Sequence, residues 1–161
     1  MNRRTTFAVV ATCALLAAAA PAWGHADFEE DSVPPDAEAV LNLKVPVEPP
    51  GHGDEDPDLA ARHNDRVTLE IPEGFTAVAC EAKPGWDCAV NPEAGRTPHH
   101  VAYDRSGGPN DPVDVFGLTV RTPRKTGTYV FEVNQTYSDG DTAHWDGDPD
   151  SDNPGATVDV E

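Results

Sequence analysis

The chain has 161 residues, with 29 acidic and 11 basic side chains and a formal net charge of -18 at pH 7. Such an acidic surface repels phosphate groups, which argues against nucleic acids and anionic membranes as partners. The length suits one domain with its own core and disfavours a second domain.

The first 24 residues have the pattern of a signal peptide. Two arginines precede a small and apolar run over 7–20, and small residues occupy the −3 and −1 positions of a cleavage site before His25. We therefore expect export, with residues 25–161 forming one mature domain outside the cell or in its envelope. The leader carries two arginines and no acid, so the mature part is more acidic still.

A second processing route begins at Cys13, because Val-Ala-Thr-Cys at 10–13 loosely resembles a lipoprotein box. Cleavage there would leave a lipidated cysteine and place His25 inside a tether. Thr12 suits that cut poorly and the apolar run continues past it, so we favour cleavage before His25. No later stretch approaches the roughly 20 apolar residues of a membrane span, so no transmembrane anchor is expected after cleavage.

Short runs of alternating apolar and polar residues, separated by proline and glycine, predict β-strands in the mature part. They follow an acidic, proline-bearing stretch that ends at Asp36. The predicted strands span 40–47, 67–71, 75–80, 86–90, 100–103, 113–120, 129–137, 142–145 and 157–160. A trace of helical period occurs at 58–62. The pattern predicts an all-β fold, an antiparallel β-sandwich of the immunoglobulin-like or cupredoxin-like kind.

Proline and glycine also mark two irregular places. Pro46 places the end of the first predicted strand at an edge or a bulge, since proline donates no ladder hydrogen bond. The segment 48–65 is rich in proline, glycine and acids, and we expect a surface insertion there.

Cys80 and Cys88 are the two cysteines that remain after the leader is removed. An even pair in an oxidising compartment is typical of a disulfide. The pair flanks a Lys-Pro-Gly-Trp turn at 83–86, so we expect the bond to staple a short hairpin. A two-thiolate metal site is the alternative. A blue-copper centre with an axial methionine is poorly supplied, because Met1 is the one methionine of the chain.

His25 would be the first residue of the mature protein. A histidine there offers its α-amine and its Nδ1 atom to one metal ion in a chelate ring. Nitrogen ligands suit copper well among the divalent metals. The amine has a pKa of about 8 in model peptides, so at neutral pH copper competes with a proton for this nitrogen.

Several motifs occur in an order that is typical of one family. They are an amino-terminal His, Val-Pro-Val-Glu at 45–48, Glu-Ile-Pro-Glu-Gly-Phe at 70–75, Pro-Gly-Trp at 84–86, Phe-Gly-Leu-Thr-Val at 116–120, Gly-Thr-Tyr at 127–129, Gln-Thr-Tyr-Ser-Asp-Gly at 135–140 and Trp145. On these residues the chain, from His25 to its end, resembles the YcnI-like copper-binding domain of exported bacterial proteins.

The resemblance implies a copper site called a monohistidine brace. In it Cu(II) is held by the amine and imidazole of His25 and by the carboxylate of Glu48, with Trp145 close to the ion. Cu(II) accepts nitrogen and carboxylate ligands in a tetragonal arrangement, and an indole face can cover the remaining side. Without the resemblance, Glu48 would be a solvated carboxylate at a strand end and Trp145 a core residue.

The resemblance also implies a function. We expect a copper chaperone or scavenger in copper homeostasis rather than an enzyme, with copper importers or copper-centre assembly proteins as possible partners. One alternative is an oxidative copper enzyme resembling the polysaccharide monooxygenases, which needs a second histidine on the same ion. The other is a metal-free β-sandwich module for interactions at the cell surface.

The other histidines are candidates for that second ligand or for weak secondary sites. His144 precedes Trp145 in one predicted strand, so the two side chains should point to opposite faces of the sheet. The rest depart from the family's usual pattern: His52, His63, His99 and His100. His99 and His100 are adjacent, so at most one of them faces any one site.

Overall fold

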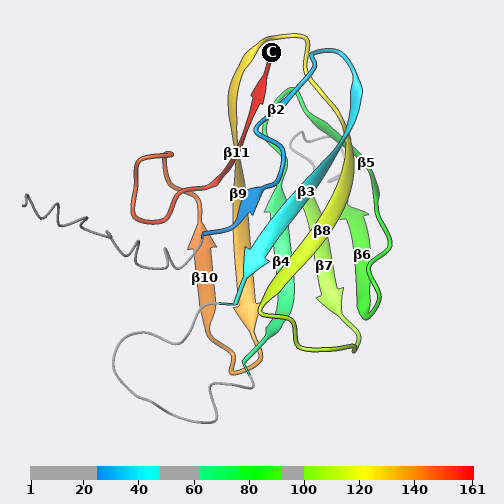
Figure 1. Cartoon of the computed structure of the whole chain (residues 1–161), viewed down its shortest axis with the longest axis vertical. Helices are drawn as coiled ribbons and strands as arrows, with labels where there is room; N and C mark the ends of the chain where they lie inside the picture. Colours follow the sequence, from blue (N-terminus) through cyan, green and yellow to red (C-terminus); the bar gives the residue numbers. More distant parts are fainter. Residues whose placement is uncertain (1–24, 48–61, 92–99) are drawn as a thin grey trace, which may run out of the picture.

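The computed structural model describes residues 25–47, 62–91 and 100–161. These ranges contain eleven β-strands and no helix, which confirms the all-β prediction. No helix of the described part could therefore span a membrane. The strands form two sheets that lie one over the other (Figure 1). The predicted leader at 1–24, with Cys13, lies outside the described residues.

The smaller sheet has four strands in the order β1-β3-β8-β5. All its pairs are antiparallel. The bounds are β1 Asp27–Phe28, β3 Glu38–Pro46, β8 Val113–Arg121 and β5 Thr76–Cys80. β3 and β8 pair over their whole lengths, from Glu38 opposite Arg121 to Pro46 opposite Val113. This pair forms the centre of the sheet, and β1 pairs with one end of the outer side of β3.

The larger sheet has the order β2-β11-β9-β4-β7-β6, and β10 also pairs with β9. The bounds are β2 Ser32–Val33, β11 Ala156–Val160, β9 Gly127–Tyr137, β4 Asn64–Glu70, β7 His100–Arg105, β6 Trp86–Asn91 and β10 Thr142–Trp145. β9 is long enough for β11 to pair along its first half and β10 along its second half.

Two short strands were not predicted from the sequence. β1 belongs to the smaller sheet, and β2, which follows after only three intervening residues, belongs to the larger one. One extended segment therefore passes from sheet to sheet. Because it arrives in the direction of β11, β2 pairs with that strand in parallel, which departs from the purely antiparallel expectation.

The core lies between the two sheets and follows the predicted alternation. On β3 the buried side chains are Leu41, Leu43 and Val45, and on β8 they are Phe116, Leu118 and Val120. Phe28 of β1 meets Phe131 of β9 edge-on at 4.9 Å between ring centroids, so the aromatic contacts cross between the sheets. Such pairs add about 0.5–1.5 kcal/mol beyond the burial of their area.

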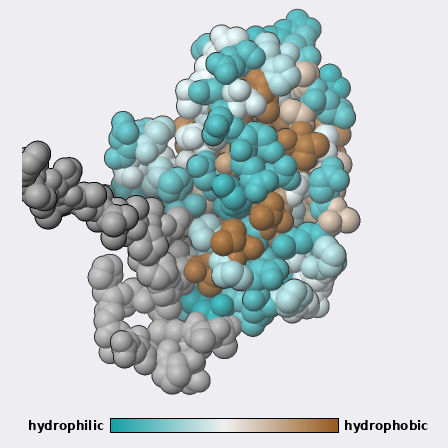
Figure 2. Space-filling view, viewed as in Figure 1, coloured by the Kyte–Doolittle hydropathy of each residue, from teal (hydrophilic) through white to brown (hydrophobic). Residues whose placement is uncertain are grey.

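The face of the molecule seen in Figure 2 is mostly hydrophilic, with separate apolar patches. Within the described part, the exposed large apolar side chains all belong to the smaller sheet: Val40, Val78, Val113 and Val115. Scattered apolar side chains of this kind are normal on a protein surface.

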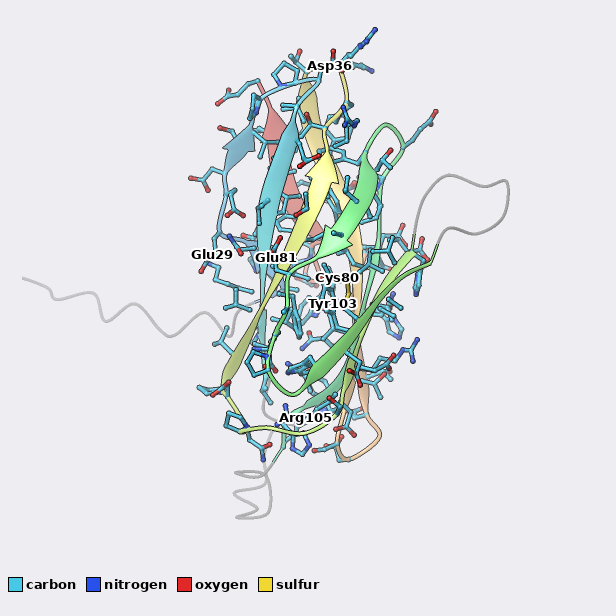
Figure 3. All side chains as sticks on the ribbon, turned by 90° about the vertical axis from the view of Figure 1, so that its right-hand side faces the viewer. Glu29, Asp36, Cys80, Glu81, Tyr103 and Arg105 are labelled. Atoms are coloured by element: carbon cyan, nitrogen blue, oxygen red, sulfur yellow. A yellow bond between two sulfur atoms is a disulfide. The ribbon has the colours of Figure 1, made fainter. Side chains whose placement is uncertain are left out.

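The structure confirms the disulfide between Cys80 and Cys88 but not the hairpin that it was expected to staple. Cys80 ends β5, whose neighbour is β8, whereas Cys88 lies in β6, whose neighbour is β7. β5 and β6 are edge strands of different sheets, so the bond closes one side of the sandwich, next to Glu81 and Tyr103 (Figure 3).

The predicted turn between these strands does form. The amide of Trp86 donates to the carbonyl of Lys83 at 3.1 Å, and Gly85 has a φ of 79°. A Cβ atom on Gly85 would lie 2.2 Å from the carbonyl oxygen of Gly107, so only glycine fits there. The turn carries the chain from one sheet to the other, because each strand already has a partner elsewhere.

The predicted insertion and the trace of helix fall mostly outside the described residues, which resume at Arg62. Arg62 is buried and not helical. Its guanidinium group stacks on the ring of Tyr137 at 3.7 Å and forms ion pairs with Asp139 and Asp141.

Candidate metal centre

His25 stands two residues before the start of β1. Its side chain is 45% exposed, and its Nε2 atom lies 3.6 Å from Oδ2 of Asp27. The other oxygen of that carboxylate accepts the amide hydrogen of Phe28 at 2.9 Å, which holds Asp27 in place. Ala26, between them, is fully buried. The imidazole therefore sits on a stem that is anchored in the fold.

The strand register relates His25 to the end of β3. Asp27 pairs with Lys44 and Phe28 with Leu43. Continuing this register by two residues sets His25 level with Pro46. The predicted ligand Glu48 comes two residues after Pro46 and lies outside the described residues.

Trp145 is the last residue of β10 and is buried, with 5% exposure. It packs in the core, which is the position expected for Trp145 when the family resemblance is left aside. Its indole N–H donates to Oε1 of Gln135. Nε2 of Gln135 in turn donates to the carbonyl of Pro46 at 2.9 Å. One side-chain amide thus connects Trp145 to the end of β3.

The packing of β1 brings it to the same region of β9. Phe28 contacts Phe131, and Phe131 stands two residues before Val133, the register partner of Trp145. Two of the three predicted site residues, His25 and Trp145, are therefore anchored on neighbouring parts of the sandwich.

A buried polar network continues inward from Gln135. Its Nε2 atom also donates to Oδ1 of Asn64 at 3.0 Å, and Nδ2 of Asn64 donates to Oδ2 of Asp114 at 3.1 Å. The other oxygen of Asp114 lies 3.2 Å from Nζ of Lys83. At most 1% of Asn64, Asp114 or Gln135 is exposed. The Asp114 carboxylate is buried as half of an ion pair, which offsets part of its desolvation cost.

Sequence reasoning missed this network, although one signal was available. Phe131 and Val133 alternate with polar residues in the predicted strand 129–137, and Gln135 continues their face with the same period of two. A polar residue in an apolar register signals a buried amide that needs partners.

The remaining histidines are placed as follows. His144 is exposed, and its Nδ1 atom contacts Oδ1 of Asn134, which confirms that it points away from the buried Trp145. His63 forms an ion pair with Asp65 at 3.1 Å, and His100 begins β7 opposite Glu70. His52 and His99 lie outside the described residues. In the described ranges, no three His, Cys, Asp or Glu side chains are grouped so that they could hold a metal ion.

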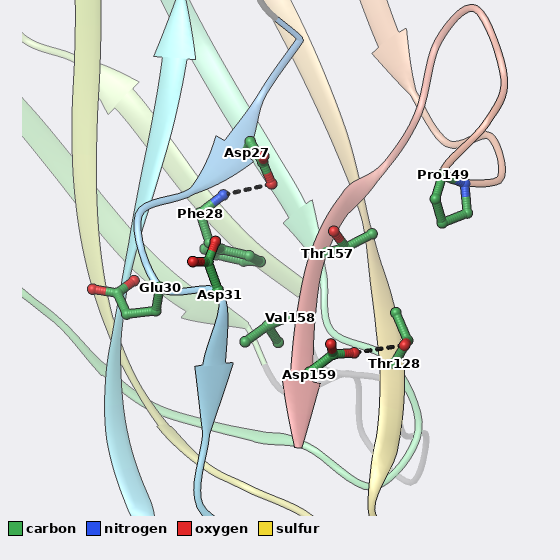
Figure 4. A pocket seen from close by; sticks show the side chains of 9 residues that line it. All are labelled: Asp27, Phe28, Glu30, Asp31, Thr128, Pro149, Thr157, Val158 and Asp159. Carbon is green, nitrogen blue, oxygen red and sulfur yellow. Dashed lines mark hydrogen bonds between the residues drawn. The ribbon is translucent and has the colours of Figure 1, made fainter. Parts of the chain in front are cut away.

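An open cleft of about 240 Å³ lies beside β1 (Figure 4). Its lining is acidic: Asp27, Glu30, Asp31 and Asp159 face it, together with Phe28, Thr128, Pro149, Thr157 and Val158. Glu30 is held by the amide and the side chain of Asn42, each at 2.7 Å. The acids give the surroundings of the His25 stem a negative potential, which attracts cations.

Two carboxylates face each other on the outside of the larger sheet, where Glu70 of β4 pairs with Glu132 of β9. Partial burial raises the pKa of the Glu132 carboxyl, and the charges of Glu70 and Asp146 raise it further. In the core, burial and the charge of Glu81 raise the pKa of the Tyr103 hydroxyl, which donates to the carbonyl of Gly117.

Comparison with known proteins gives a family and a fold. A family model described as "Domain of unknown function (DUF1775)" matches residues 25–160. No curated protein matches the chain. An uncharacterized protein from Nocardia farcinica, whose crystal structure is described as revealing an immunoglobulin-like fold, is similar at 20% identity. Its TM-score is 0.67, over 84% of this chain and 97% of that chain. This likeness supports the immunoglobulin-like form of the predicted sandwich.

A cohesin–dockerin complex from Clostridium thermocellum is also similar in structure, at 10% identity and a TM-score of 0.46. The match covers 85% of this chain and 98% of that chain. The score is too low for any argument about function.

Proposed function

Because the chain belongs to the family described as Domain of unknown function (DUF1775), a domain that YcnI-like proteins also carry, we propose that it is an exported Cu(II)-binding protein. The ion would be held at the amino terminus that cleavage before His25 creates. The observation that carries the proposal is a coincidence of boundaries. The family model begins at residue 25, the residue that the leader pattern independently marks as the first of the mature chain.

The geometry around His25 supports this role. A chelate ring at the terminus uses the α-amine and Nδ1, and it leaves Nε2 free for another contact. Nε2 is the atom that faces Asp27. A carboxylate beside the imidazole of a ligand helps to orient the ring, as is common around metal-binding histidines. Glu48 would add the carboxylate that offsets part of the charge of Cu(II).

Transport or storage of copper fits this arrangement better than catalysis. The imidazole is exposed, so an ion bound there can be handed to another protein without opening the fold. The acidic cleft beside β1 would raise the local concentration of cations. We therefore favour a copper chaperone or scavenger, with a copper importer or a copper-centre assembly protein as its partner.

The test is a Cu(II) titration followed by electron paramagnetic resonance on protein whose first residue is His25. The matched control is the same protein before its amino-terminal tag is removed, in which His25 has no free amine. We expect tight one-to-one binding that is lost in the control and in His25→Ala. Equal binding in all three proteins would move the site elsewhere. A lack of tight binding in the free-amine protein would favour a metal-free module.

A further inference from the structure

We propose that Gln135 is a positioning residue of this copper site, an inference that rests on the proposed function. Its side chain touches no predicted ligand. It acts by fixing the indole of Trp145 against the part of β3 that is level with His25.

The amide of Gln135 is saturated by partners from three strands. Oε1 accepts from Trp145 of β10, while Nε2 donates to Pro46 of β3 and to Asn64 of β4. An indole N–H can only donate and a backbone carbonyl can only accept, so chemistry allows one orientation of the amide. With 1% exposure, water does not compete for these bonds.

Of the three hydrogen bonds of Gln135, the bond to Pro46 is the one that joins the two sheets. Gln135, Asn64 and Trp145 belong to the larger sheet, whereas Pro46 ends β3 of the smaller sheet. Nδ2 of Asn64 reinforces this crossing by reaching the carbonyl of Val45 at 3.4 Å. Hydrogen bonds therefore join the two sheets at the end of β3 that is level with His25, and the indole of Trp145 belongs to the same network.

A buried hydrogen-bond network of this kind is more than packing alone requires. Leucine has nearly the volume of glutamine and would fill the space, but it would leave the indole N–H of Trp145 and the carbonyl of Pro46 without their partner. What only the amide provides is a fixed direction for the indole ring relative to the end of β3. A cation–π contact with a bound ion depends on that direction.

The experiment compares Gln135→Leu and Gln135→Glu in protein that begins at His25. The leucine variant removes all three hydrogen bonds. The glutamate variant, buried as a protonated acid, keeps an acceptor for Trp145 but has only one donor for Pro46 and Asn64 together, so it also serves if the leucine variant does not fold. We expect the Cu(II) dissociation constant to rise about 10- to 100-fold, with a changed resonance spectrum, as is typical when an outer partner of a metal site is removed.

The matched control is Thr122→Val, which removes buried hydrogen bonds of another site. The Thr122 hydroxyl donates to the carbonyl of Pro34 at 2.7 Å and accepts from the amide of Ala37 at 2.9 Å. Thr122 directly follows β8 and is eight positions after Asp114, which corresponds to about 26 Å of extended chain. We expect this variant to lose stability while its copper affinity stays within about twofold of the wild-type value.

A double variant with Trp145→Phe then separates positioning from general weakening. If Gln135 acts through the indole, the combined loss of affinity is smaller than the product of the two single losses. Folded Gln135 variants with the affinity and spectrum of the wild type would overturn the positioning role and leave the copper site intact. Wild-type protein that binds no Cu(II) tightly would overturn both proposals.

Discussion

Cys80 at the end of β5 is bonded to Cys88 in β6, and the two strands belong to different sheets. The disulfide closes one side of the sandwich, while the amino-terminal segment with β1 and β2 joins the sheets on the other side. The proposed copper site therefore lies on the side of the sandwich opposite the disulfide.

Removal of the disulfide should weaken the fold and leave copper binding unchanged. The sequence separation is 8 residues, and closure of so short a loop contributes about 2–3 kcal/mol to the free energy of unfolding. Denaturant unfolding of a Cys80→Ser, Cys88→Ser double variant would measure this loss. A fall in copper stoichiometry in the folded double variant would instead favour the two-thiolate site.

The carboxylate behind His25 should tune copper affinity. We expect Asp27→Asn to raise the Cu(II) dissociation constant about 10-fold, because the neutral amide attracts the imidazole more weakly than the carboxylate, which lies 3.6 Å from Nε2. Glu29→Gln is the matched control, since it removes one negative charge from the same segment without touching His25. An equal effect of both variants in a competition titration would mean that only the total charge matters.

Trp145→Phe should change both the fold and the copper site. The loss of the indole N–H leaves Oε1 of Gln135 buried without its partner, which costs about 1–3 kcal/mol. We also expect the resonance spectrum of bound Cu(II) to change. Thermal unfolding and the spectrum are measured on the same samples, with Trp86→Phe as a control for the loss of a core indole. A large loss of stability with an unchanged spectrum would assign Trp145 to the core alone.

Glu132→Gln should stabilise the protein in a pH-dependent way. Because the folded-state pKa of Glu132 is raised, its ionised form is disfavoured in the fold. The penalty is absent below the unfolded-state pKa of about 4.3 and grows as the pH rises through the folded-state value. Since Glu70 stands directly opposite and solvent screens this exposed pair, we expect a gain of only roughly 0.2–1 kcal/mol at pH 7 and none at acid pH.

Thermal unfolding of Glu132→Gln at neutral and acid pH gives this difference. Glu38→Gln is the control, because Glu38 pairs with Arg121 and its removal should bring no gain. A gain for Glu132→Gln that is the same at both pH values would contradict the electrostatic cause.

The strands that were predicted correctly share one property, which is alternation over four residues or more. The segment 142–145 was predicted with its observed bounds, and the opposite directions of His144 and Trp145 followed from the same alternation. β1 and β2 have two residues each, too few to show a period. Their pairing depends on strands that come later in the chain.

Pairing partners and buried polar contacts were harder to predict. The turn at Pro84 and Gly85 was placed correctly, but nothing in a local stretch says that the strands on its two sides join different sheets. Gln135 was assigned no role because its partners are distant in sequence. The bond to Pro46 spans 89 positions, and only the folded chain brings the two residues together.

The short stem that carries His25 has a thermodynamic consequence. Ala26 and Phe28 are buried, and β1 and β2 fasten the segment to both sheets before the chain reaches its first long strand. A ligand at the end of a loose tail must lose conformational freedom when it captures an ion, and this loss reduces its affinity. Here folding has already restricted the backbone behind His25. Copper capture would therefore show only a small heat-capacity change, with calorimetric curves governed by bond formation and proton release.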